Sequence, residues 1–161
     1  MAAIVLQACT GTNAGTENTV IGVMMRANDS HLLTILNPIQ IPVAGTAYSY
    51  EKWLRFKCTV APSNQVTTFK YWGPNTIPAV GTLLFAGTNA TGVTPVVTDS
   101  AVATTQQDTN YYDTSNQLAI GGTLVNINDE SEFLVLQLDV ATTASPGDIV
   151  QQTHNYSFDE N

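Results

Sequence analysis

The feature that most restricts the fold is a strict alternation of side chains in two segments. In residues 53–60 the even positions are all apolar, whereas the odd positions carry a mixed set that includes Arg55 and Lys57. Residues 133–140 alternate in the same way, but both of their faces are largely apolar. A period of two is typical of a β-strand, and apolar residues on both faces favour a strand in the middle of a sheet. Cys58 is then a small buried apolar side chain on the inner face of its strand.

Further strands are expected where apolar or Thr-rich runs lie between turn residues such as Asn37-Pro38 and Gly121-Gly122. These runs are residues 3–8, 20–27, 31–36, 65–72, 82–86, 93–97, 101–105, 117–120 and 123–127, with a C-terminal strand in which Val150, His154, Tyr156 and Phe158 share one face. Short strands and turns at this spacing predict an all-β fold, an antiparallel β-sandwich of jelly-roll type with little or no helix.

The longest stretch without Gly or Pro, residues 96–120, is also not helical in character. It is rich in Thr, Asn, Asp and Ser, whose side chains compete with the helix for backbone hydrogen bonds. We expect a strand that runs into a long loop over residues 106–116, with Tyr111 and Tyr112 at its tip.

Length and charge narrow the classes of function. A chain of 161 residues suits one domain, so we expect residues 1–161 to form a single β-sandwich; the segment 1–15 is either an arm that extends onto a neighbour or an ordinary outer strand. Five Lys and Arg against 13 Asp and Glu give a formal net charge of −8, which argues against nucleic acid as a partner. No run approaches ~18 consecutive apolar residues, so no membrane-spanning helix is expected.

Catalytic and metal-binding patterns are weak in this sequence. Neither histidine belongs to a nucleophile–base motif: we expect His154 to form a core or inter-strand hydrogen bond and His31 to be exposed in a turn. The two cysteines, Cys9 and Cys58, form neither a disulfide framework nor a zinc pattern. We therefore expect a protein that is not an enzyme, with no catalytic residue, metal or cofactor.

One acidic cluster leaves a cation site open. Asp129, Glu130 and Glu132 could supply oxygen ligands to calcium, although their spacing is not that of a known calcium loop. A solvated hairpin is the favoured interpretation.

The basic residues are concentrated in one part of the chain. All but one of the five Lys and Arg residues fall within residues 52–70, next to two tryptophans. Because Trp and Arg are common in interface hot spots, this segment is interpreted as a contact patch, with a solvated strand face as the alternative. The candidate interface residues are Trp53, Arg55, Lys57, Lys70 and Trp72, together with Tyr111 and Tyr112 in the loop.

Three segments taken together resemble small structural proteins of tailed bacteriophages. They are MAAIVLQACTG at residues 1–11, PVAGTAYSYEKWLRF at 42–56, and THNYSFDEN at 153–161. The first is similar to a short apolar strand followed by Thr-Gly, the second to an A-G-T-x-Y-S-x-x-K segment before an alternating strand, and the third to a closing aromatic strand capped by Asp-Glu. The resemblance implies a virion component of the kind that decorates or cements the outer face of the head, often β-rich and often trimeric. It supplies no catalytic residue.

These observations lead to two expectations about function. The first is a non-enzymatic decoration protein on the capsid surface, with the major capsid protein and two further copies of this chain as partners. The second is a carbohydrate- or receptor-binding β module of a tail or fibre, in which Trp53, Trp72, Tyr111 and Tyr112 would form the sugar platform.

Overall fold

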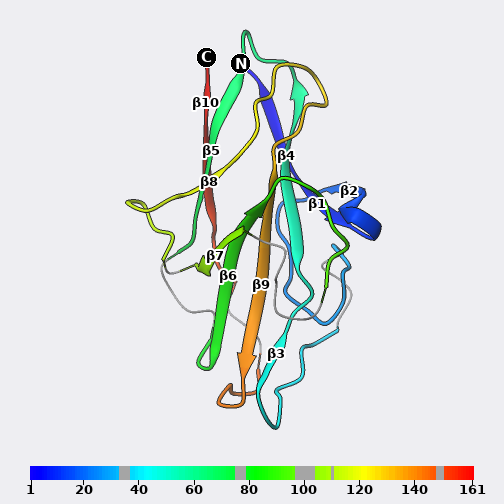
Figure 1. The fold of residues 1–161 in the computed structure, drawn as a ribbon, viewed down its shortest axis with the longest axis vertical. Helices are drawn as coiled ribbons and strands as arrows, with labels where there is room; N and C mark the ends of the chain where they lie inside the picture. Colours follow the sequence, from blue (N-terminus) through cyan, green and yellow to red (C-terminus); the bar gives the residue numbers. More distant parts are fainter. Residues whose placement is uncertain (33–36, 75–78, 97–103, 110, 148–150) are drawn as a thin grey trace.

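The computed structural model describes residues 1–32, 37–74, 79–96, 104–109, 111–147 and 151–161, with only the backbone described for residues 104–108. Within these ranges the chain consists of strands joined by turns and irregular loops, and its one helical element is a 3-10 segment of three residues (Figure 1). The elements in chain order are β1 (Ala3–Thr10), the short 3-10 segment η1 (Thr12–Ala14), β2 (Thr16–Thr19), β3 (Thr46–Tyr48), β4 (Lys52–Val60), β5 (Val66–Trp72), β6 (Thr82–Asn89), β7 (Thr104–Asp108), β8 (Leu118–Ile120), β9 (Phe133–Ala141) and β10 (Asn155–Glu160).

The strands form two antiparallel sheets. The larger has the order β2-β1-β4-β9-β6-β7, with β3 also paired to β9, and the smaller has the order β10-β5-β8. In Figure 1 the smaller sheet lies beside the upper part of the larger one, at the end where both termini are found. The all-β antiparallel sandwich is therefore confirmed. The jelly-roll form is not, because the strands divide seven to three, whereas a jelly roll has eight strands in two Greek keys.

The main core lies between the two sheets. The ring of Phe56 on β4 stacks on the ring of Phe69 on β5, with 5.2 Å between centroids and 10° between planes. Leu54, Phe56 and Cys58 are all buried, as the alternation in β4 requires. Val60, the last apolar residue of that run, is exposed because the strand ends there. Strand β9 is buried along most of its length and pairs with both β4 and β6, which makes it the central strand that its sequence predicts.

Some predicted strands are absent because apolar loops take their place. Within residues 20–27, Val20, Val23 and Met25 pack against the core without forming a strand, and β2 lies just before them. Likewise 93–96 and 123–127 form no strand, although Leu124 makes an isolated bridge to Val66. Residues 33–36, 97, 101–103 and Val150, which belong to other predicted strands, lie outside the described residues.

Most of the other predicted strands are present, and one predicted loop begins later than expected. Strands are confirmed over most of 3–8, 53–60, 65–72, 82–86, 117–120 and 133–140, and β10 confirms the C-terminal strand from Asn155 onward. The long loop predicted over 106–116 is wrong at its start, because β7 continues to Asp108 through backbone pairing with β6.

Residues 1–15 do not extend from the sandwich as an arm. Strand β1 pairs with β4 from Ala3 to Cys9 and with β2 from Gln7 to Thr10. Cys9 and Ala14 are buried in a second, smaller core on the outer face of the larger sheet. Strand β1 is not an outer strand either, because it lies between β2 and β4 in the sheet.

Candidate interaction surface

The residues of the predicted contact patch lie on opposite faces of the sandwich. On β4 the inner positions hold Leu54 and Phe56, so Arg55 and Lys57 point outward from the larger sheet. On β5 the inner positions hold Phe69 and Tyr71, so Lys70 and Trp72 lie on the outer face of the smaller sheet. The interpretation of these residues as one patch is wrong, because β4 and β5, although joined by a short loop, belong to different sheets.

Trp53 is also not available as a surface anchor. Its side chain is 1% exposed and packs edge-on against Phe133, with 5.2 Å between ring centroids. Its indole Nε1 donates a hydrogen bond of 2.9 Å to Oε2 of the buried Glu51. The outer face of the sheet is covered at this point by Ala14 and Val93, which the alternation within β4 alone does not reveal.

The two loop tyrosines have different environments. Tyr112 is buried, and its ring meets that of Tyr71 edge-on at 6.5 Å and that of Tyr111 at 5.5 Å. Tyr111 is 57% exposed. Of this pair only Tyr111 can meet a partner, so the nomination of Tyr112 as a contact residue is wrong.

Arg55 and Lys57 are held in an ion-pair network on the outer face of the larger sheet. Arg55 forms ion pairs with Glu17 and, at 2.8 Å, with Glu130. Lys57 forms ion pairs of 2.9 Å with the same two carboxylates. Burial alone would raise the pKa of Glu17, but hydrogen bonds from Lys57 and Arg55 outweigh it and hold that pKa below its usual range. The network therefore links β2, β4 and the segment before β9. Because Arg55 and Lys57 already have carboxylate partners within the chain, they are less available to bind a partner.

We expect the variant Arg55→Met to be destabilised by about 2 kcal/mol, because charge-assisted hydrogen bonds contribute roughly 1.5–3 kcal/mol. The substitution leaves two carboxylates on Lys57 and removes the guanidinium that lies 5.0 Å from the Phe133 ring centroid. Urea unfolding measures the loss. Lys70→Met is the matched control, and an equal loss in both variants would contradict a stabilising role for the network.

Two further basic side chains are buried. Lys52 donates hydrogen bonds from Nζ to the carbonyl oxygens of Asn28, at 2.7 Å, and Ser30, at 3.3 Å. Arg26 is 1% exposed and donates from Nη1 to the carbonyl oxygen of Leu32. Among the described residues, Lys70 is then the one Lys or Arg that is neither buried nor ion-paired. The accessible surface of the protein is consequently acidic.

The buried Lys52 predicts a rise in stability between pH 8 and pH 9. Burial lowers the pKa of Lys52 from 10.5 to about 8, so in this window the unfolded chain binds a proton that the folded chain has lost. Stability then increases with pH, by about 1 kcal/mol over this unit, and the slope is expected to disappear in Lys52→Met. Urea unfolding at four pH values across the window measures it.

Above pH 9 two other groups oppose this rise. Burial raises the pKa of Cys9 from 9.0 to about 11, and burial also raises the pKa of Tyr71. These groups stay protonated in the folded chain while the unfolded chain releases protons, so their contribution lowers stability as pH rises. The contribution of Lys52 increases until its unfolded pKa of 10.5, so the profile should flatten before it falls. A wild-type profile that is flat from pH 8 to 9 would contradict the assignment to Lys52.

The acidic cluster near residue 130 does not converge on one point. Oδ2 of Asp129 accepts hydrogen bonds of 2.8 Å from the backbone N–H groups of Val125 and Asn126. Glu130 is ion-paired with Arg55 and Lys57, and the Glu132 carboxylate lies against Gly121. Among the described residues, no group of three or more His, Cys, Asp or Glu could hold a metal ion.

The environment of His154 agrees with its predicted role. Its Nδ1 lies 2.7 Å from the hydroxyl oxygen of Tyr71, and the two rings are stacked with 5.7 Å between centroids. Burial lowers the pKa of His154. The predicted hydrogen bond is present, but it joins Tyr71 of β5 to a residue that lies just before β10. His31 is only partly exposed.

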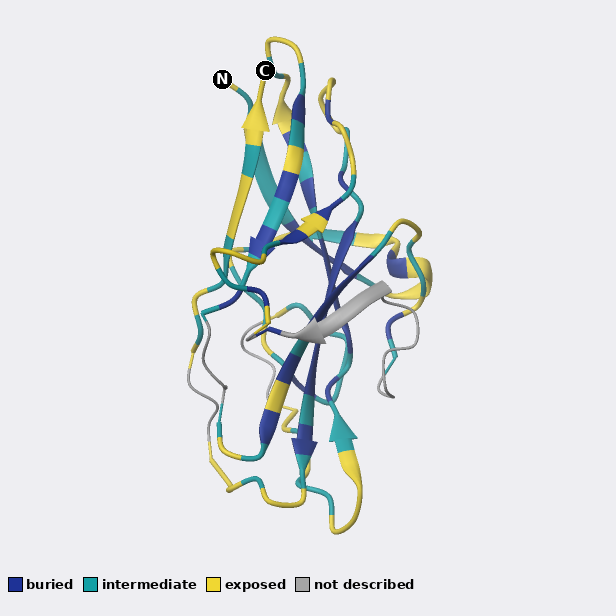
Figure 2. Cartoon of the chain, turned by 60° about the vertical axis from the view of Figure 1, so that its left-hand side comes forward, coloured by how far each residue is buried: buried dark blue, intermediate teal, exposed yellow. Residues whose placement is uncertain are grey.

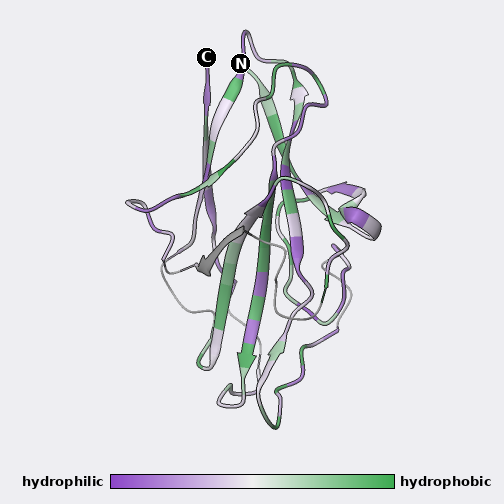
Figure 3. Ribbon diagram, viewed as in Figure 1, coloured by the Kyte–Doolittle hydropathy of each residue, from purple (hydrophilic) through white to green (hydrophobic). Residues whose placement is uncertain are grey.

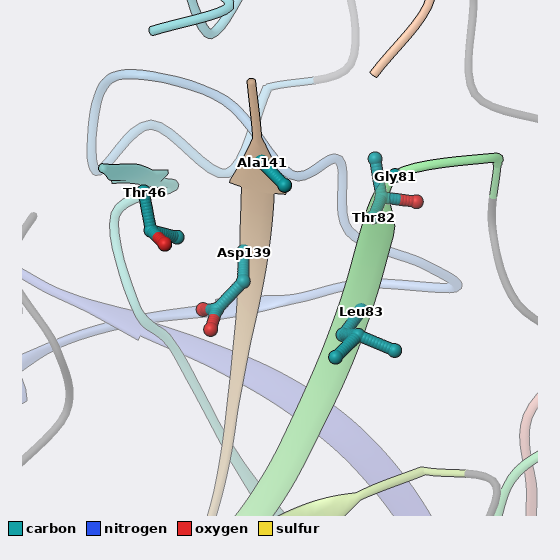
Figure 4. Close-up of a pocket in the computed structure, with 6 residues that line it drawn as sticks. All are labelled: Thr46, Gly81, Thr82, Leu83, Asp139 and Ala141. Carbon is teal, nitrogen blue, oxygen red and sulfur yellow. The ribbon is translucent and has the colours of Figure 1, made fainter. Parts of the chain in front are cut away.

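A shallow groove of about 290 Å³ lies at the lower end of the larger sheet (Figure 4). Its floor is the end of β9 and its walls are β3 and β6; it is lined by Thr46, Gly81, Thr82, Leu83, Asp139 and Ala141. Its polar side chains are two threonines and one carboxylate.

Exposed apolar side chains gather at the opposite end of the molecule. Val60 at the end of β4 is 51% exposed, and Val125 and Ile127 in the segment before β9 are 44% and 57% exposed. Two backbone hydrogen bonds hold this segment to Cys58 on β4: Asn128 N–H donates to Cys58 O at 2.8 Å, and Cys58 N–H donates to Asp129 O at 2.9 Å. We call Val60, Val125 and Ile127, with the neighbouring carboxylates of Asp129 and Glu160, the β4-end surface. Figure 2 shows exposed residues around this end.

Comparison with protein-family models, with curated proteins and with solved structures gave no match to this chain. Among the described residues, no helix is long and apolar enough to cross a membrane.

Proposed function

We propose that this chain is a non-enzymatic decoration protein that binds the outer surface of a tailed-phage head and stabilises the shell. Its main partner is the major capsid protein, and it acts as a homotrimer. The proposal joins the resemblance of three sequence segments to phage structural proteins with the chemistry of the folded surface.

The observation that carries the proposal is that four of the five basic side chains, all within the described residues, are buried or ion-paired within the chain. Arg26 and Lys52 are buried, and Arg55 and Lys57 are ion-paired within the chain. A surface with so few unpaired Lys and Arg side chains repels nucleic acid and anionic lipid. Another protein is therefore the partner that fits this surface. Its many uncharged Thr, Asn and Ala side chains can be buried at a contact without the desolvation of charges.

Repetition on a lattice strengthens such weak contacts. A trimer that touches several capsid subunits at once gains avidity, because the second and third contacts form at high effective concentration. Cementing of a shell then requires no single contact of high affinity.

Cryo-electron microscopy of the virus particle that carries this chain tests the proposal. Density for the sandwich on the outside of the head, at three-fold or quasi-three-fold positions, is the expected result. Density on the tail or at a fibre tip would overturn it and favour carbohydrate or receptor binding. Absence of the chain from purified particles would reject the virion assignment.

The sugar-binding alternative has less support from the aromatic side chains. Two members of its expected platform, Trp53 and Tyr112, are buried, and only Trp72 and Tyr111 keep exposed area. A glycan array on the wild-type chain is the direct measurement for it, and specific binding would favour the second function.

A further inference from the structure

We propose that the β4-end surface is the face with which this protein docks, and that it meets an apolar protein patch bordered by Lys and Arg side chains. The inference rests on the proposed function, since it names the face that meets the shell and the chemistry of the surface on the other side.

The apolar part of this surface comes from two segments far apart in sequence. Val60 ends β4, whereas Val125 and Ile127 belong to the segment between β8 and β9, which Figure 1 shows beside the end of β4. Single exposed apolar residues are ordinary, but a group of them at one end of a molecule marks an interaction site. Leu124, next to Val125, is fully buried, so the segment is anchored in the core while its neighbours face solvent.

The segment is held in one conformation before any partner arrives. The Asp129 carboxylate accepts hydrogen bonds from two backbone N–H groups, and these bonds hold its pKa below the usual range. Cys58 fixes the same turn through its backbone, as described above. A preformed surface loses little conformational entropy on binding, which favours a docking role over that of a solvated loop.

The charges around the surface specify the partner. Glu160 of β10 lies close by, since β10 ends opposite Val66 and the Glu160 carboxylate accepts a hydrogen bond of 2.7 Å from the N–H of Ala2. The same carboxylate forms an ion pair of 3.7 Å with the N-terminal amine of Met1, which offsets part of its charge. Burial raises the pKa of Cys58 beneath this surface, and the negative charges of Asp129 and Glu160 raise it further. The nearest basic side chain along β4, Lys57, is held between Glu17 and Glu130. An acidic border disfavours nucleic acid and anionic lipid and is complementary to basic protein side chains.

The other end of the sandwich offers a matched control. Val43, before β3, and Val80, before β6, are even more exposed than the apolar residues of the β4-end surface. Apolar exposure alone therefore does not distinguish the two ends, and the choice of the β4-end surface depends on its carboxylates and its preformed turn. Figure 1 shows the starts of β3 and β6 at the end far from the termini. The hydropathy view in Figure 3 shows that strand β10, at the docking end, is largely hydrophilic, in keeping with an acidic border.

The test compares two double variants for binding to phage heads from which this chain has been removed. Val125→Ser with Ile127→Ser is expected to weaken co-sedimentation with the heads at least ~10-fold, whereas Val43→Ser with Val80→Ser should change it less than ~2-fold. Because all four side chains are exposed, both variants should unfold at the same urea concentration as the wild type. Binding of the wild type should also weaken at about 1 M NaCl, where charges are screened within roughly 3 Å.

Carbodiimide cross-linking on native particles gives a second measurement that needs no variant. Cross-links from Asp129 or Glu160 to lysines of the major capsid protein are expected. Cross-links only from Asp113, which lies between β7 and β8, would overturn the proposed face. Loss of binding in the Val43 and Val80 variant, with normal binding in the Val125 and Ile127 variant, would also overturn it. In both of those cases the proposed function stands. If the wild-type chain does not bind the heads at all, the proposed function fails and this surface fails with it.

Discussion

Replacement of Phe56 by alanine is expected to lower the free energy of unfolding by about 3–5 kcal/mol, the range for removal of a large aromatic side chain from a core. Phe56 is 1% exposed and lies where the two sheets meet. Its ring stacks on Phe69 of the smaller sheet and lies 4.9 Å from the ring of Tyr156 on β10. Its loss therefore weakens the contact between the sheets and not only the packing within one of them.

Differential scanning calorimetry and urea unfolding measure this effect. For a chain of this size we expect the melting temperature to fall by roughly 10 °C. Val60→Ala is the matched control on the same strand, because Val60 is half exposed and should contribute less than about 0.5 kcal/mol. Equal losses in the two variants would show that the sheets do not share a packed layer at Phe56.

Trp53→Ala is expected to destabilise the chain by a similar amount, about 3–5 kcal/mol, through the smaller core on the outer face of the larger sheet. This core contains Cys9, Ala14 and Phe133, so the cavity would lie beneath η1. The milder change Trp53→Phe keeps an aromatic ring but removes the donor to Glu51. We expect it to cost about 1–3 kcal/mol, because a buried carboxylate then lacks one hydrogen bond.

Fluorescence separates a core role for Trp53 from a contact role. In Trp72→Phe the emission comes from Trp53 alone, and acrylamide should quench it poorly because the indole is buried. Under conditions in which the Trp53→Phe variant is folded, it should also bind phage heads as tightly as the wild type does. A Trp53→Phe variant of wild-type stability that no longer binds would reverse this assignment and restore Trp53 as a contact residue.

The strands with a strong apolar alternation are those that the sequence predicts well. The inner face of β4 and the central position of β9 follow from their patterns, because burial on one face or on both leaves a period of two. Residues 20–27, 93–96 and 123–127 carry similar apolar patterns but pack as irregular segments. Val23, Val93 and Leu124 are at least partly buried there without a continuous backbone ladder. An apolar pattern thus reports burial and does not report hydrogen-bond pairing.

Edge strands show the opposite case. Strands β2, with the sequence TENT, and β7, with TTQQD, have no apolar alternation and are held by backbone pairing with β1 and β6. Their partners are distant in sequence or depend on a turn, so local propensity contains little information about them.

The candidate surface depends still more on long-range contacts. The β4-end surface joins Val60 to Val125 and Ile127, residues that no local pattern connects. The hydrogen bonds between Cys58 and Asn128–Asp129 bring them together, and no spacing rule anticipates these bonds.

By itself the sequence determined that this chain is an acidic all-β protein. Net charge depends only on composition, and the alternation of side chains that favours a strand is local, so neither depends on how the strands are arranged. Only the tertiary structure decided which charged side chains are ion-paired and which aromatic rings are buried. It paired Arg55 and Lys57 with Glu17 and Glu130, buried Trp53 and Tyr112, and placed Lys70 and Trp72 on the opposite face. The physical reason is that burial and ion pairing depend on which strands become neighbours, and here that depends on contacts between segments many residues apart.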